Sequence, residues 1–344
     1  MKVCILSNEV EDDHLLWILA CKEYKIDYKV VNLTRSDWLK EVTKYNFDYF
    51  LAKPSGLTST FKQLYDERIF ILSDVYHFKI YPTPLEIFLY ENKRFLYSWL
   101  EANDLPHPKT LIFYNKDEAL QYIRKCNYPI VGKTSIGASG SGVKILRTYQ
   151  MAHSYILKSF SKQGIPKRWG PNLEKGHLLK RLAVSLLNPK ELFNKVHKYL
   201  EVKKDVLKNF VILQEFIPHD YEWRIVVIGD SYFAHKKIVK RDKASGTLLK
   251  EYSNPPFYIL DFAKSIMERF GFVSQAIDAF ETERGKLIIN EMQCIFGQSD
   301  PYQMLVNGVP GRYRFINNQW VFEKGDFAKN ACYNLRIEHV LSII

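Results

Sequence analysis

The chain has 344 residues, of which 47% are hydrophobic and 15% aromatic. This composition is typical of a globular protein with two or three packed subdomains and excludes a disordered chain. No apolar run approaches the roughly 18 residues that a membrane span needs, and the start is too briefly apolar for a signal peptide. Five scattered cysteines form no C-x-x-C pair, which argues against a disulfide framework or a zinc site. We expect a cytoplasmic protein with reduced thiols and no membrane partner.

The net charge of +11 is concentrated in one segment. Residues 161–209 hold twelve basic and four acidic side chains, so they carry eight of the eleven positive charges. The segment opens with glycines and prolines and then shows an apolar stripe over 189–200, which predicts an amphipathic helix. Two interpretations stay open: a solvated helical surface, or a surface that recognises a large anionic acceptor.

The first 80 residues alternate between short apolar runs and amphipathic stretches. The patterns predict strands at 3–6, 28–33, 49–52 and 70–72, and helices at 14–24 and 61–69. This alternation indicates a small open α/β domain with a parallel sheet. The following Tyr81-Pro82-Thr83-Pro84 run breaks regular structure and marks a boundary.

Later segments have equally clear patterns, up to residue 300. We predict helices at 93–102 and 257–270, and strands within the segments 128–133, 143–146, 211–218, 221–229, 232–238, 276–280 and 287–292. Residues 301–344 match no template, and we expect them to wrap back on the core.

A glycine-rich loop follows the strand that ends in Lys133. Glycines let the backbone approach a ligand and present N–H donors to phosphate oxygens, and the lysine adds a mobile positive charge. The lysine precedes the glycines, so the loop is not a Walker A box, and it lacks the Rossmann glycine order. Taken alone, the loop is equally typical of a hairpin that binds nothing.

Four more segments follow this loop in a definite order: 211–218, 221–229, 277–280 and 287–293. In that order and spacing, the chain resembles the ATP-grasp superfamily over about residues 80–300. The resemblance is nearest to the carboxylate–amine ligases, such as ribosomal-protein glutamate ligases and the ligases that macrocyclise peptides. It implies an N-terminal α/β domain followed by a two-lobed ATP-grasp domain, whose antiparallel sheets sandwich ATP. The implied regions are 1–80 (N-terminal domain), 81–110 (linker helix), 111–210 (small lobe with the insertion 161–209) and 211–344 (large lobe and C-terminal extension).

The same resemblance implies roles for residues that would bind ATP. Lys93 on the linker helix and Lys133 would contact phosphates, and Glu222 would bond the ribose hydroxyls. The lid over the phosphates would be Ser139, Gly140, Ser141 and Gly142. The adenine hinge would be Gln214, Glu215, Phe216 and Ile217. Without the resemblance, the hinge segment is typical of a plain buried strand and Lys93 of an exposed lysine.

Two cations on the hairpin 221–238 are the candidate catalytic residues. Arg224 and Lys236 could both point at the terminal phosphate, where fixed positive charges stabilise phosphoryl transfer. Related ligases carry an arginine and a lysine at similar places. Lys237 is more typical of solvated surface, and substrate contact is the alternative.

Asp278, Glu291 and Gln293 form the candidate metal site. Glu291 and Gln293 are two residues apart on one strand, so their side chains face the same way, and Asp278 lies on the preceding strand. Such oxygen ligands suit Mg²⁺. The family usually has asparagine where Gln293 stands, and the longer arm of glutamine leaves the geometry open. A charged cross-strand cluster without metal is the alternative.

The leading hypothesis is a Mg²⁺- and ATP-dependent ligase that activates a small-molecule or peptide carboxylate as an acyl phosphate and joins it to an amine. One rival is a kinase on the same scaffold. Another is a nucleic-acid or polyanion binder, suggested by the basic segment 161–209, although that segment lacks the interleaved aromatic residues of stacking platforms. The apolar stripe near Leu192 could serve a homodimer interface.

Overall fold

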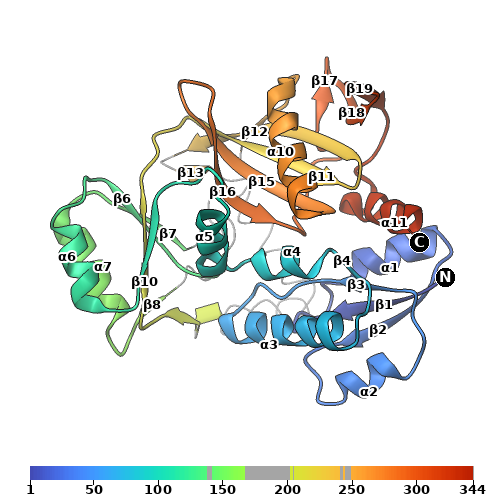
Figure 1. Ribbon diagram of the computed structural model, residues 1–344, viewed down its shortest axis with the longest axis horizontal. Coiled ribbons are helices and arrows are strands. Elements are labelled where there is room, and N and C mark those ends of the chain that lie inside the picture. Colours follow the sequence, from blue (N-terminus) through green and yellow to red (C-terminus); the bar gives the residue numbers. More distant parts are fainter. Residues whose placement is uncertain (138–141, 167–201, 204, 241–242, 245–248, 344) are drawn as a thin grey trace, which may run out of the picture.

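The computed structural model describes residues 1–137, 142–166, 202–203, 205–240, 243–244 and 249–343. Within them the chain forms three main sheets, each with its own hydrophobic core. Figure 1 shows the N-terminal sheet in blue, most of the small-lobe sheet in green and the large-lobe sheet in yellow, orange and red. No helix in these described ranges is long and apolar enough to cross a membrane.

The N-terminal region is the expected α/β domain with a parallel sheet. Its strands are β1 (Lys2–Ser7), β2 (Asp27–Asn32), β3 (Tyr49–Ala52) and β4 (Ile80–Tyr81), in the order β2-β1-β3-β4. Its helices are α1 (Leu15–Glu23), α2 (Trp38–Thr43) and α3 (Ser59–Phe70). The central strand β1 is almost wholly buried, as expected where helices cover both faces of a parallel sheet.

The strand predicted at 70–72 is wrong. Helix α3 continues there into a π-helical turn, Ile71–Val75, in which the Tyr76 N–H donates to the Ile71 carbonyl at 3.2 Å. A short apolar run fits a buried helix as well as a strand, and periodicity cannot separate them.

Helix α4 (Pro84–Leu89) was not predicted. Its start carries a capping box between Thr83 and Glu86, with Pro84 at the first helical position. Both features are sequence signals of a helix start. The sequence interpretation missed them because it took the two prolines of the 81–84 run as a break in regular structure.

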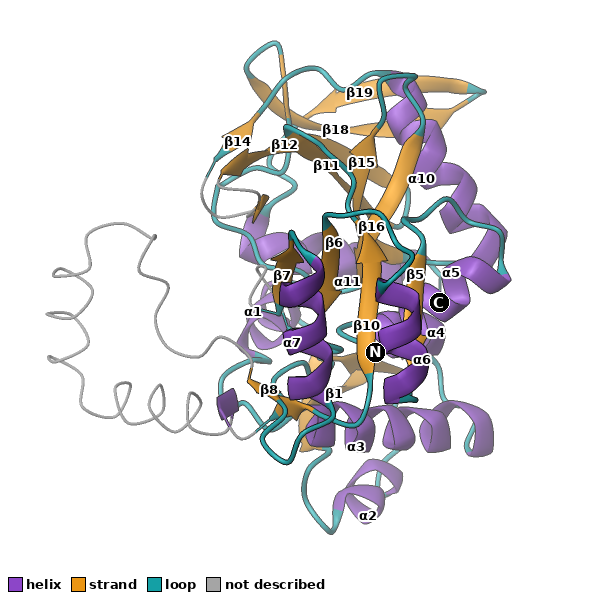
Figure 2. Ribbon diagram, turned by 90° about the vertical axis from the view of Figure 1, so that its left-hand side faces the viewer, coloured by secondary structure: helices purple, strands orange, loops and turns teal. Residues whose placement is uncertain are grey.

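The small lobe is an antiparallel sheet covered on its outer face by two helices (Figures 1 and 2). The strand order is β5-β10-β6-β7. The elements are β5 (Thr110–Phe113), α6 (Lys116–Ile123), β6 (Ile130–Lys133), β7 (Val143–Leu146), α7 (Tyr149–Ser159) and β10 (Val211–Glu215), with a small β8 (Ile165–Pro166) and β9 (Val206–Leu207) pair. The helix predicted over 189–200, and with it most of the basic segment, lies outside the described residues.

The large lobe is a mostly antiparallel sheet in the order β16-β15-β11-β12-β18-β17. Its strands are β11 (Tyr221–Ile228), β12 (Ser231–Lys240), β13 (Lys243–Ala244), β14 (Lys250–Glu251), β15 (Ser274–Glu281), β16 (Leu287–Gln293), β17 (Leu305–Val306), β18 (Val309–Ile316) and β19 (Gln319–Lys324). Helices α5 (Lys93–Ala102) and α10 (Phe257–Phe270), both at the predicted residues, add apolar side chains to its core.

The C-terminal segment returns to the N-terminal domain. After the 3₁₀ turn η2 (Lys329–Cys332), helix α11 (Tyr333–Ser342) packs against α1, as Figure 1 shows. The rings of Trp17 and Tyr333 meet edge to face at 4.7 Å, and Ile337 and Val340 join the N-terminal core. The segment 301–344 therefore wraps back as expected, while β17 to β19 extend the large sheet.

Candidate active site

A cavity of about 680 Å³ lies where the three sheets meet. Its walls come from β6 and β7 of the small lobe, from β11, β12, β15 and β16 of the large lobe, and from the hinge segment 214–217 between the lobes. The N-terminal domain lines one end through Asp13 and Lys53, and the C-terminal segment lines it through Tyr333 at the start of α11. Side chains from distant parts of the sequence therefore share one cavity.

Strand register brings oppositely charged residues together in this cavity. Arg224 on β11 lies opposite Asp278 on β15, and Asp278 lies opposite Glu291 on β16. The Arg224 guanidinium donates from Nε to Asp278 Oδ1 and from Nη2 to Oδ2, both at 2.8 Å. Burial opposes ionisation of Asp278, but Arg224 and Lys237 hold its pKa below the usual range.

Lys237, which the sequence interpretation assigned to solvated surface, is buried in this array. Its ammonium lies 2.6 Å from Asp278 Oδ2 and 2.7 Å from Glu222 Oε2. Glu222, predicted to bond ribose hydroxyls, thus pairs with a cation and also accepts a hydrogen bond from Asn290. It lines the cavity.

The structure does not bring Lys236 into the cavity. In a strand, neighbouring side chains point to opposite faces, and Lys236 lies opposite Trp223, whereas Lys237 lies opposite Glu222. The Lys236 ammonium sits 4.2 Å from the Tyr221 ring centroid and 3.8 Å from Glu251. Of the two predicted catalytic cations, Arg224 alone lines the cavity.

The sequence contains a signal that distinguishes Lys237 from Lys236. A two-residue turn, Gly229-Asp230, joins β11 and β12 and pairs Ile228 with Ser231. Gly229 takes a positive φ of 55°, as tight hairpin turns require. This register places odd residues of β12 opposite even residues of β11, and therefore puts Lys237 on the face of Arg224.

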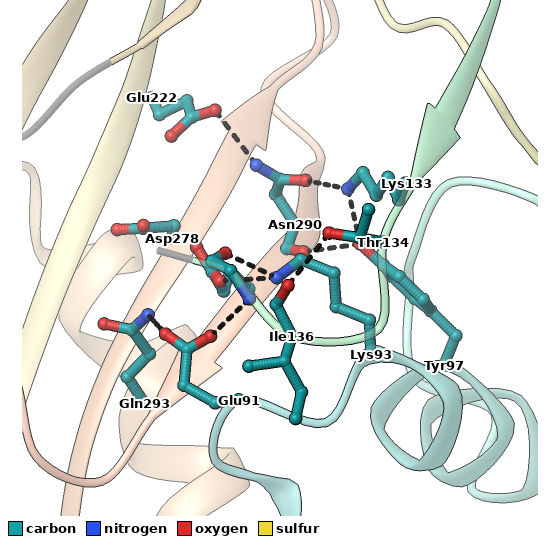
Figure 3. Close-up of polar contacts among 12 residues, drawn as sticks. Glu91, Lys93, Tyr97, Lys133, Thr134, Ile136, Glu222, Asp278, Asn290 and Gln293 are labelled. Carbon is teal, nitrogen blue, oxygen red and sulfur yellow. Dashed lines mark hydrogen bonds and ion pairs between the residues drawn. The ribbon is translucent and has the colours of Figure 1, made fainter. Parts of the chain in front are cut away.

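A β-bulge adds a residue that the sequence interpretation missed. Asp278 pairs with Glu291 and the next residue, Ala279, with Ile289, so Asn290 is the extra residue. Its side chain donates to Glu222 at 3.0 Å and accepts from the Lys133 ammonium at 2.9 Å (Figure 3). Strict alternation would have turned either Asn290 or Glu291 away from the cavity, whereas both line it.

The two predicted phosphate lysines both reach this cavity (Figure 3). Lys133 ends β6 and also donates to the Tyr97 hydroxyl at 2.5 Å. Burial, together with the nearby charge of Lys93, lowers the pKa of Lys133 to about 7. Lys93 begins α5 and donates to the Gly137 carbonyl at 3.0 Å and to Glu291 at 3.3 Å.

Glu91 ties the glycine-rich loop to the candidate metal residues. It accepts from the Gly137 N–H at 3.0 Å and from the Gln293 amide at 3.2 Å. Of the predicted lid, Ser139, Gly140 and Ser141 lie outside the described residues. Gly142 accepts from the Thr134 N–H at 2.8 Å, and a Cβ at Gly142 would lie 1.7 Å from the Thr134 hydroxyl. Close packing therefore requires glycine there.

The predicted hinge residues Gln214, Glu215, Phe216 and Ile217 all line the cavity. The Gln214 side chain donates to the Thr110 hydroxyl at 2.7 Å, and Glu215 accepts from the Lys109 N–H at 2.9 Å. Beside the hinge, the walls are apolar: Val131 and Ile145 come from the small lobe and Phe280 from the large lobe. Apolar side chains from both lobes therefore line the cavity beside the hinge.

Comparisons with known proteins place this geometry in a fold. The structure resembles a RimK domain ATP-grasp protein from Sphaerobacter thermophilus with a TM-score of 0.51 and 16% identity, over 85% of this chain and 90% of that one. It also resembles D-alanine–D-alanine ligase from Bacillus anthracis with a TM-score of 0.52 and 12% identity, over 87% and 88%. The chain has the ATP-grasp fold, as its motif order suggested.

Curated relatives share sequence with the chain, while no family model matches it. Phosphoribosylamine–glycine ligase from Clostridium acetobutylicum is 27% identical over 165 residues, which is 46% of this chain and 36% of that protein. Glutamate–LysW ligase ArgX from Sulfolobus acidocaldarius is 23% identical over 147 residues, or 43% and 50%. The chain thus spans half or less of these relatives' lengths. Both relatives carry the name of a ligase.

Proposed function

We propose that the chain is a Mg²⁺- and ATP-dependent ligase that joins a carboxylate to an amine. One observation carries this proposal: the cavity combines apolar walls at the hinge with a cluster of cations paired to carboxylates. The adenine ring would lie at this end, against apolar residues that include Val131 and Phe280. The phosphates would then extend toward Lys93, Lys133 and Arg224. The two ligase relatives, though matched over part of their length, support the same chemistry.

The candidate metal residues fit magnesium by the chemistry of their donors. Asp278 and Glu291 lie directly opposite each other, and Gln293 lies two cross-strand pairs further along, on the same face as Glu291. In the described part of the chain, His, Cys, Asp and Glu form no group of three or more that could hold a metal ion, so the set depends on the Gln293 amide oxygen. When bound, Mg²⁺ would neutralise phosphate charge and orient the terminal phosphate.

In the proposed reaction, a carboxylate oxygen of the substrate attacks the γ-phosphorus and the bond to the β–γ bridging oxygen breaks, releasing ADP. The amine then attacks the acyl carbon, phosphate leaves and an amide forms. No protein nucleophile is needed. Arg224, Lys93 and Lys133 would bear the charge of the transferring group, and their hydrogen bonds hold them in place before the reaction.

In this proposal the carboxylate substrate is a small molecule or a peptide, and the amine is a second substrate. The end of the cavity beyond the phosphates, lined by the N-terminal domain and the C-terminal segment, is the space left for them. A large anionic acceptor at 161–209 and a homodimer remain predictions, because most of that segment lies outside the described residues.

The test is ADP release from Mg-ATP with pooled carboxylates and hydroxylamine as a general amine trap. Hydroxamate formed with ADP would support the ligase, whereas a stable phosphorylated product without hydroxamate would favour the kinase. Glu291→Ala should abolish turnover without unfolding the protein. The control is Glu283→Ala, on the exposed turn between β15 and β16. Normal turnover by Glu291→Ala would refute the metal assignment.

A further inference from the structure

Lys237 sits at the centre of a buried charge cluster. The cluster consists of Arg224 and Lys237 against Glu222 and Asp278, two positive and two negative side chains. The Lys237 side chain is 5% exposed and that of Asp278 is 2% exposed. In so little water, each charge depends on its partners rather than on solvent.

Both oxygens of Asp278 are engaged by these cations. Oδ1 accepts from Arg224 Nε at 2.8 Å, and Oδ2 accepts from Arg224 Nη2 at 2.8 Å and from Lys237 at 2.6 Å. A carboxylate offers about four lone-pair positions, so three of the four on Asp278 are used. A metal ion that binds Asp278 must therefore share or replace these contacts.

Lys237 is the partner best able to give way. Arg224 holds Asp278 through a planar, two-pronged contact, which resists rotation, whereas lysine carries a compact charge on a flexible four-carbon stem. The Lys237 side chain also lines the cavity. Its ammonium can turn toward a bound anion through side-chain rotation alone.

We propose that Lys237 and magnesium compete for Asp278, and that nucleotide phosphates resolve the competition by giving Lys237 a new anionic partner. Metal binding and nucleotide binding are then coupled through one side chain. Without phosphates, a divalent cation meets a carboxylate already neutralised by two cations. With them, Lys237 moves to phosphate oxygen and Asp278 becomes available. This inference rests on the proposed function, because it uses Asp278 as a metal ligand.

The coupling predicts that Lys237→Met changes two affinities in opposite directions. Removing the competing ammonium should tighten binding of free Mn²⁺, used as a probe for magnesium, at least tenfold. The same change should weaken binding of Mn-ADP at least tenfold, because a phosphate partner is lost. A structural role for Lys237 would not move these constants in opposite directions.

The chain offers a matched control one residue away. Lys236→Met removes the same charge from the same strand, but on the face turned away from the cavity. It should leave both constants unchanged. Lys237→Arg keeps a cation and should retain weak Mn²⁺ binding. Lys237→Gln also removes the charge, and it replaces Lys237→Met if that variant does not fold. Circular dichroism and a thermal scan establish folding.

The experiment is Mn²⁺ titration by electron paramagnetic resonance and ADP titration by calorimetry, with and without Mn²⁺, on the full chain. Tighter free Mn²⁺ binding in Lys237→Met, with weaker Mn-ADP binding, supports the inference. Unchanged Mn²⁺ affinity in Lys237→Met, or equal changes in Lys236→Met, overturns it while the proposed function stands. If the unaltered chain binds neither ADP nor ATP with metal, the proposed function fails and this inference falls with it.

Discussion

If Lys133 contacts the nucleotide phosphates as proposed, nucleotide binding should depend on pH in a direction that follows from the shifted pKa of Lys133. The residue is 5% exposed, and burial with the charge of Lys93 nearby lowers the pKa of its ammonium to about 7. A phosphate placed beside it would favour the charged form and raise the pKa again. Binding at pH 8 should therefore take up a proton, and affinity should fall as pH rises above 7.

The size of the effect follows from linkage. If phosphate restores the pKa of Lys133 to about 10, near its ordinary value, affinity falls about twofold between pH 6 and 7 and about 50-fold between pH 7 and 9. Proton uptake at pH 8 should be about 0.9 per nucleotide. The free energy of unfolding depends on pH in the opposite direction to the nucleotide affinity. The folded protein holds fewer protons on Lys133 than the unfolded chain does between pH 7 and about 10, so its contribution to the free energy of unfolding increases with pH.

The assay is calorimetric titration of ADP at pH 6 to 9 in buffers of different ionisation enthalpy. Lys133→Met should lose the uptake and the slope, while Lys286→Met, on an exposed turn, should keep both. ADP itself titrates in the same way with all three proteins, so its contribution cancels when their ADP affinities are compared as ratios at each pH. Equal proton uptake by Lys133→Met and the unaltered chain, or an affinity independent of pH between 7 and 9, would refute the reasoning.

Two further substitutions and one labelling experiment test how the protein is packed. The side chain of Glu86 is fully buried and accepts hydrogen bonds from backbone N–H groups at the start of β15 with one oxygen and from the Thr83 N–H with the other. Glu86→Gln keeps only one acceptor oxygen, so its NH2 group must face one of these two sets of donors, and urea unfolding should show a loss of about 2–4 kcal/mol in the free energy of unfolding, against almost none for exposed Glu118→Gln. Gly132→Ala places a Cβ 2.6 Å from the Tyr155 ring, so a thermal scan should show a loss of about 1–3 kcal/mol, partly recovered by Tyr155→Leu. Half-buried Cys126 should react with a thiol reagent in the folded protein. The other four cysteines are buried and should react only in urea: Cys4, Cys21, Cys294 and Cys332. Fast labelling of more than one thiol in the folded protein would contradict this burial.

Local patterns determined a large part of this protein. Helix α5 begins and ends at the predicted residues, because its apolar side chains recur with helical period and Asn92 caps its start. The hairpin of β15 and β16 follows from two apolar strands around a glycine turn. Such local rules placed Lys133 at a strand end and Arg224 on a strand, and the order of the motifs identified the ATP-grasp fold.

Tertiary structure decided which of these side chains meet. The register of β11 and β12 selected Lys237 over Lys236, a bulge turned Asn290 into the cavity, and the connection between α4 and α5 brought Glu91 to Gly137. The path of α11 back to the N-terminal core had no local signal, because its contacts lie about 300 residues away in the chain. A residue type and its period fix an element and its faces, whereas contacts across the cavity depend on how separate elements pack.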